Sequence, residues 1–134
     1  MRGKWLIAAS VVAALAVGVA LASHMGGESA EHRVRRHFDV PGTLDTVSLR
    51  AAVLRQLPIG SPEARLTDFV AVARIGADEA SSYFPIESDG SAAIRIDETP
   101  APLDPVVESY IIAFQFDGAR RLRDVRVHRI LTGP

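Results

Sequence analysis

The chain of 134 residues contains no cysteine. This absence excludes structural disulfides, cysteine-ligated zinc, thiolate nucleophiles and a lipid-anchoring cysteine. Many small exported domains depend on disulfides, so a domain of this composition must hold together by packing alone. Its length allows one modest hydrophobic core besides a targeting segment.

Lysine and asparagine are also scarce. Lys4 is the only lysine, and asparagine does not occur. Together with the abundant alanine, this composition is typical of a GC-rich bacterial genome. Arginine is therefore the default cation of this chain, and a single arginine is weak evidence for bidentate recognition of an anion.

The first 22 residues have the pattern of a targeting segment. Arg2 and Lys4 precede an uncharged run at residues 5–22, which ends in Ala20-Leu21-Ala22. This small-x-small ending predicts a cleaved signal peptide. The alternative is an uncleaved N-terminal membrane anchor, since the run is at the lower limit for a membrane-spanning helix. Both interpretations export the remaining chain, to a periplasmic or extracellular location.

Residues 23–42 are interpreted as a spacer followed by a charged stretch, and residues 43–134 as the folded domain. The charged stretch, Glu31 to His37, shows no apolar stripe, and we expect it to be extended or frayed. Two helices should then open the domain.

The first helix is expected from about Thr46 to Leu57, before Pro58, and the second from Pro62 to Ile75. For the second we expect Ser61 as N-cap and Gly76 just after the end. The apolar residues at helical spacing are Val47, Leu49, Val53, Leu54 and Leu57 in the first helix, and Leu66, Phe69, Val70 and Ala73 in the second.

The apolar period then changes from helical to alternating. Strands are predicted at Ala92–Asp97, Val106–Phe116 and Leu122–Leu131, the last two joined by an Asp117-Gly118 turn. The three prolines of Thr99–Pro105 exclude a central strand there. We expect one set of alternating residues to face the core: Tyr110, Ile112, Phe114, Phe116, Val125, Val127 and Leu131. The order predicts an α+β domain in which two helices cover one face of a roughly three-stranded antiparallel sheet, in two layers.

The stretch from Val47 to Thr132 resembles the bacterial SmpA/OmlA (BamE-like) group of small envelope domains and related uncharacterised exported proteins. The residues that carry the resemblance are Gly60, Ser61, Leu66, Val70, Gly76, the Phe114-Gln115-Phe116-Asp117-Gly118 hairpin, Leu122 and Val125. The chain departs from the group by lacking the cysteine that is usually lipidated and the Gly-x-Pro that often closes the second helix. The resemblance implies a fold and a compartment, and it assigns no task.

No set of residues predicts catalysis or a bound cofactor. His32 and His37 are five residues apart, share a face of neither a helix nor a strand, and lie among arginines that would repel a metal ion. The sequence has no Gly-x-Ser-x-Gly elbow and no glycine-rich phosphate loop. We therefore expect no catalytic, cofactor-binding or metal-binding residues, and a protein that is not an enzyme.

Charge is distributed unevenly along the chain. Residues 78–108 hold eight carboxylates and one arginine, whereas residues 118–134 hold five arginines and one carboxylate. Solvated faces with cross-strand pairs account for this pattern. The alternative is a basic surface that attracts anionic lipid or an acidic partner, formed with Arg33, Arg35 and Arg36. Nucleic acid is not an expected partner, because the exported part is acidic overall.

Two functions remain as hypotheses. The first is a non-catalytic module of the cell envelope that binds another protein, for example by strand addition to a free sheet edge. The second is a domain that binds a small molecule or lipid in a pocket between the helices and the sheet. Such a pocket would be lined by Phe69, Tyr83, Phe84, Tyr110 and Phe114.

Overall fold

The computed structural model describes residues 29–77, 80–98 and 106–133. Within these ranges the elements are α2 (Ala30–Phe38), α3 (Thr46–Gln56), α4 (Glu63–Ala73), β1 (Ser81–Phe84), β2 (Ser91–Asp97), β3 (Val107–Phe116) and β4 (Leu122–Thr132). The predicted signal peptide or anchor at residues 1–22 and the proline-rich residues 99–105 lie outside the described part. No helix in the described ranges is long and apolar enough to cross a membrane.

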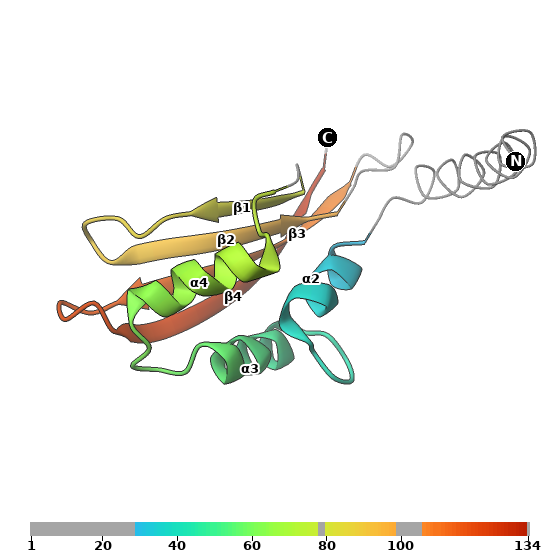
Figure 1. Cartoon of the computed structure of the whole chain (residues 1–134). Helices are drawn as coiled ribbons and strands as arrows, with labels where there is room; N and C mark the ends of the chain where they lie inside the picture. Colours follow the sequence, from blue (N-terminus) through green and yellow to red (C-terminus); the bar gives the residue numbers. More distant parts are fainter. Residues whose placement is uncertain (1–28, 78–79, 99–105, 134) are drawn as a thin grey trace, which may run out of the picture.

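The four strands form one antiparallel sheet in the order β1-β2-β3-β4. All three described helices lie on the same side of this sheet (Figure 1). The predicted α+β class is confirmed. The predicted number of elements was wrong, because the described chain has three helices and four strands instead of two helices and about three strands.

One hydrophobic core fills the space between the helices and the sheet. Ile94, Ile112 and Phe114 from the two central strands are at most 2% exposed, and Leu49 and Leu66 from α3 and α4 at most 1%. Each fully buried side chain of this kind contributes roughly 1.5–3 kcal/mol relative to an exposed one. The face predicted for β3 is confirmed, since its buried apolar residues are Tyr110, Ile112, Phe114 and Phe116.

Helix α2 replaces the extended stretch expected at residues 31–37. Its apolar residues are few, but Ala30, Val34 and Phe38 are spaced by four and are all buried. Ser29 caps the first turn by accepting a hydrogen bond from the backbone N–H of His32. The expectation was wrong because three apolar residues on one side of a short helix are enough to pack that side against an existing core.

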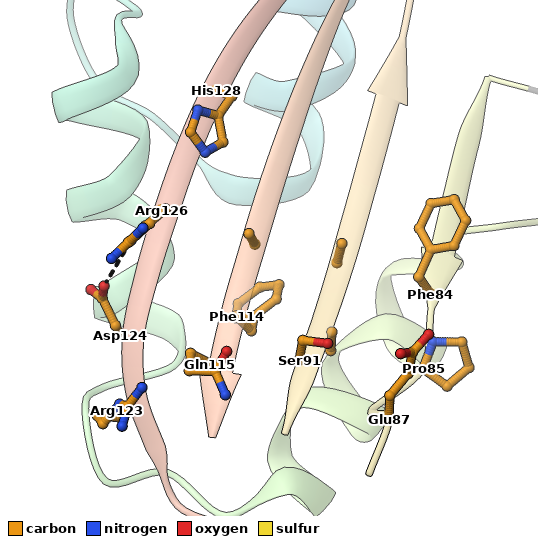
Figure 2. A pocket seen from close by; sticks show the side chains of 13 residues that line it. Phe84, Pro85, Glu87, Ser91, Phe114, Gln115, Arg123, Asp124, Arg126 and His128 are labelled. Atoms are coloured by element: carbon orange, nitrogen blue, oxygen red, sulfur yellow. Dashed lines mark hydrogen bonds and ion pairs between the residues drawn. The ribbon is translucent and has the colours of Figure 1, made fainter. Parts of the chain in front are cut away.

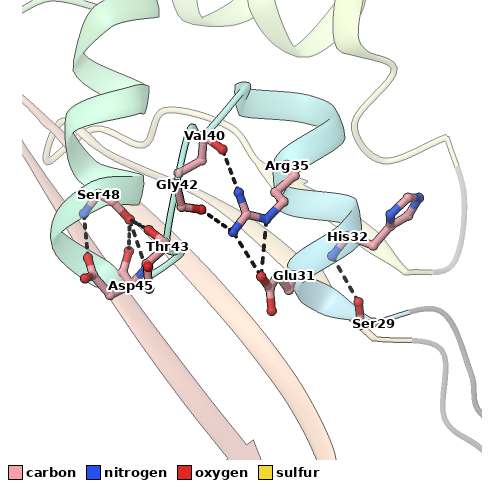
Figure 3. Close-up of polar contacts among 9 residues, drawn as sticks. All are labelled: Ser29, Glu31, His32, Arg35, Val40, Gly42, Thr43, Asp45 and Ser48. Carbon is pink, nitrogen blue, oxygen red and sulfur yellow. Dashed lines mark hydrogen bonds and ion pairs between the residues drawn. The ribbon is translucent and has the colours of Figure 1, made fainter.

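Arg35 fixes the end of α2 to the loop that leads into α3 (Figure 3). Its guanidinium donates to the carbonyl oxygens of Val40 (2.7 Å) and Gly42 (2.6 Å) and, at 3.1 and 3.2 Å, to the carboxylate of Glu31. A planar group with several donors suits such a junction better than a single ammonium would. This arginine therefore has a structural role in holding the loop.

The ends of the other two helices differ from expectation in detail. Helix α3 begins with a capping box in which Asp45 and Ser48 exchange hydrogen bonds, and the bond from the Ser48 backbone N–H lowers the pKa of the Asp45 carboxyl. Helix α4 has Pro62 at its N-cap position, so the cap predicted for Ser61 was wrong; the Ser61 hydroxyl donates to a carbonyl instead. Arg74, not Gly76, adopts the left-handed conformation that closes α4.

Two apolar residues of the predicted patterns are exposed, Val47 of the helical spacing and Leu131 of the expected core face. Val47 is 76% exposed near the start of α3, where the buried residues are Leu49, Ala52 and Val53. Leu131 is 61% exposed because β4 extends beyond the layer of helices. The short strand β1 carries no alternating pattern long enough to predict and was missed.

Truncating Phe114 to alanine should lower the free energy of unfolding by about 3–5 kcal/mol, the range for a buried phenylalanine. The ring is 2% exposed at the centre of the core. Arg126→Ala is the matched control on the other face of the sheet and should change stability by less than about 0.5 kcal/mol. Thermal or denaturant melts of both purified variants measure this. A Phe114→Ala variant that melts like the parent would contradict the assignment of the core face.

Candidate functional site

The sheet face opposite the helices is crossed by a row of four paired residues. Phe84 on β1 pairs with Ala93 on β2, Ala93 with Ala113 on β3, and Ala113 with Arg126 on β4. Because side chains alternate along a strand, these four point away from the core that their neighbours fill. Two methyl groups in the middle, with a phenyl ring and a guanidinium at the ends, create a low floor between two higher rims.

A hollow of about 810 Å³ lies over this floor (Figure 2). The β1 rim consists of Phe84, Pro85 and Glu87, and the β4 rim of Arg123, Asp124, Arg126 and His128. Small-molecule pockets span about 300–1,000 Å³ but enclose most of their ligand. This hollow instead lies open along the sheet surface, where Phe84 is 53% exposed. Its form suits the surface of another macromolecule.

The two rims differ in charge. On the β4 side, Asp124 accepts hydrogen bonds from Arg126 at 3.2 Å and from Arg50 of α3 at 3.3 Å. The bond from Arg126, with that from Arg50, lowers the pKa of the Asp124 carboxyl. Two guanidinium groups thus share the single carboxylate of Asp124, and Arg123 adds a further positive charge to this rim. The opposite rim carries the negative charge of Glu87.

In the first half of β4, backbone groups on the outer edge of the strand are hydrogen-bonded to other described residues. Leu122 exchanges backbone hydrogen bonds with Gly60 (2.7 Å) and Ser61 (2.8 Å), and Arg50 donates to the Val125 carbonyl oxygen at 2.7 Å. Backbone groups of an edge strand point outward at every second residue. The stretch after Val125, up to the exposed end of the strand, is therefore the longer free edge of the described sheet.

A second polar cluster lies at the far end of β3 and β4, on the helix side. Arg129 donates two hydrogen bonds of 3.1 Å to the carboxylate of Glu108, which lowers the pKa of Glu108 and raises that of Arg129. Burial, with the nearby charge of Glu108, raises the pKa of Tyr110 to about 12. The phenol therefore stays protonated at neutral pH, and the cluster joins two strands.

The three described histidines lie on two elements. His32 and His37 lie on α2 and His128 on β4. Within the described residues, no three histidine, aspartate or glutamate side chains are grouped so that they could hold a metal ion. His24 lies outside the described residues.

The three arginines expected to attract anionic lipid have different surroundings. Arg33 is 8% exposed on the buried side of α2. Arg35 is engaged with Glu31 and two loop carbonyls, whereas Arg36 is exposed. Arg33 and Arg36 are three residues apart and lie on neighbouring positions of the helix, whereas Arg35 points to the other side. Because Arg33 is also buried, the three arginines do not form one exposed surface.

The aromatic residues expected around a helix–sheet pocket are divided between both faces of the sheet. Tyr110 and Phe114 are buried in the core, and Phe69 and Tyr83 pack against it. Phe69 also stacks on Phe38, with ring centroids 5.3 Å apart. Phe84 lies on the opposite face, in the row described above. Its assignment to the helix side was wrong, because the register of β1 turns it away from the core.

Comparison with family models, with curated proteins and with solved structures found no match to this chain. The resemblance to the SmpA/OmlA group thus stays a prediction.

Arg129→Met should reduce the loss of stability that the protein shows as the pH falls from 7 to 3. The lowered pKa of Glu108 contributes stability above the ordinary glutamate pKa of about 4.3, and that contribution is lost as the pH falls through the lowered value. At pH 7 the free energy of unfolding of the parent should therefore exceed that of the variant, by at most about 1 kcal/mol for a pair at the surface. This difference should shrink towards pH 3. Melting curves from pH 3 to 7, with Arg65→Gln as control, measure this. A difference independent of pH would contradict the assignment.

Proposed function

We propose that this domain is a non-catalytic module that binds another protein through the face of its sheet that none of the described helices covers. The observation that carries the proposal is the apolar, hollowed row of Phe84, Ala93 and Ala113 on that face. The solvated face of an antiparallel sheet is normally polar, and an exposed apolar surface with a polar rim is typical of an interaction site.

The remaining predictions from the sequence extend this proposal. The pattern of residues 1–22 favours export, so the partner is expected in the cell envelope or outside the cell. We propose a non-catalytic role because the sequence contains no Gly-x-Ser-x-Gly elbow and no glycine-rich phosphate loop. Among the three arginines expected to contact anionic lipid, Arg36 is the exposed one, whereas Arg33 is buried and Arg35 is half-buried.

Binding of a small molecule or lipid between helices and sheet is the less favoured function. Leu49, Ile94 and Ile112, which meet at that interface, are completely buried. A ligand there would have to displace close-packed core side chains, which is costly. The open face offers a binding surface without that cost.

Site-specific photocrosslinking in intact cells tests the proposed function. Benzoylphenylalanine at position 113, on the floor of the hollow, should give an adduct of defined mass that weakens when Arg126→Glu is added. The matched control is the same probe at position 72, where Val72 is 85% exposed on α4 and should give no such adduct. Equal adducts at both positions, or none at position 113, would refute the sheet face as the binding surface.

A further inference from the structure

We infer that the hollow on the open sheet face receives an amphipathic α-helix of the partner, with an acidic flank turned towards β4. The inference rests on the proposed function and adds the chemistry of the bound element. It follows from three observations on the same face: the pairing of the floor strands, the width between the rims and the charges on the rims.

The floor of the hollow favours a helix over an extended segment. Ala93 and Ala113 lie on β2 and β3, and both of these strands pair with a neighbour on each side. Their backbone groups are used within the sheet, so an extended segment lying on this face would find no strand to pair with. A helix satisfies its own backbone hydrogen bonds and can rest on the face by side-chain contact alone.

The spacing of the rims fits one helix. Neighbouring strands are separated by about 4.8 Å, so β1 and β4 lie roughly 14 Å apart across the two central strands. An α-helix with its side chains is about 10–12 Å wide. The alanine floor lets the helix approach closely, and Phe84 offers a ring against one side of its apolar stripe.

The charges on the two rims determine which flank of the bound helix faces β4 and which faces β1. Arg123 and Arg126 line the hollow on the β4 rim together with one carboxylate, Asp124, to which Arg50 also donates. Glutamate or aspartate side chains on one flank of the helix complement this rim. Glu87 on the opposite rim favours an arginine or lysine on the other flank.

The chain's own segments fit this description poorly. The apolar run at residues 5–22 contains no carboxylate, so it has no acidic flank. The helices of a second copy turn their apolar stripes into their own core, as Val34, Val53 and Leu66 show. The acidic helix is therefore assigned to a different protein.

Selection from a displayed helix library tests the inference. The probe is a library of peptides of about 20 residues with a fixed leucine stripe and random flanking positions, selected against the intact protein. We expect one flank to be enriched in glutamate and aspartate, and retention to fall more than about tenfold with Ala113→Gln, which raises the floor. With the double variant Arg123→Glu, Arg126→Glu, the same flank should become enriched in lysine and arginine.

Matched variants separate a local from a general charge effect. Arg55→Glu with Arg65→Glu changes the net charge equally on the exposed helix side and should leave the acidic preference unchanged. An unenriched library, or an acidic preference that survives charge reversal on β4, would overturn the inference. Tighter binding of a proline-interrupted library, or a dimer in sedimentation that Ala113→Gln dissociates, would also overturn it by identifying an extended segment or a second copy.

The outcomes for the two proposals can be told apart. If photocrosslinking at position 113 finds a partner while the library gives no acidic helices, the protein-binding function stands and the helix is refuted. If the library gives acidic helices but crosslinking at positions 113 and 72 is the same, the function fails while the chemistry of the hollow holds.

Discussion

Packing of the helices against one face of the sheet is the interaction on which the rest of this structure depends. The core contains Ile94 and Ile112 from the central strands and Leu49 and Leu66 from the helices, all buried. No disulfide supports this layer, since the chain has no cysteine. Because the core lies on only one face of the sheet, every second residue of each strand points to the other face and does not pack into the core. The open face can therefore carry a binding surface at little expense to stability.

The sequence predicted those elements whose apolar pattern is long. Four apolar residues mark the stripe of α4 and four the alternation of β3, and both elements were found close to their predicted positions. Helix α2 was missed because its buried residues are separated by arginine and histidine, so the charged character hid a stripe with a spacing of four. Strand β1 was missed because four residues are too few for a period. Leu131 was misplaced because the sequence does not tell where the helix layer ends.

The candidate site could not be predicted from the sequence, for a different reason. Alternation identifies Ala93 and Ala113 as residues that face away from the core, but the hollow exists only because pairing places them side by side. The register also brings Phe84 to one end of their row and Arg126 to the other. That register depends on the turn at Gly90, whose φ of +83° and close approach to the Phe116 carbonyl require glycine. Small residues on the non-core side of two adjacent strands are the one signal that could have indicated the site.

Hydroxyl-radical footprinting tests the central claim most directly, because it compares the same side chains in the purified protein and in intact cells. Phe84 on the open face and Val72 on α4 are both exposed in the structure. The account predicts that both are oxidised in the purified protein and that Phe84 becomes protected in cells while Val72 does not. Equal oxidation of Phe84 in both samples, or protection of Val72 instead, would contradict it.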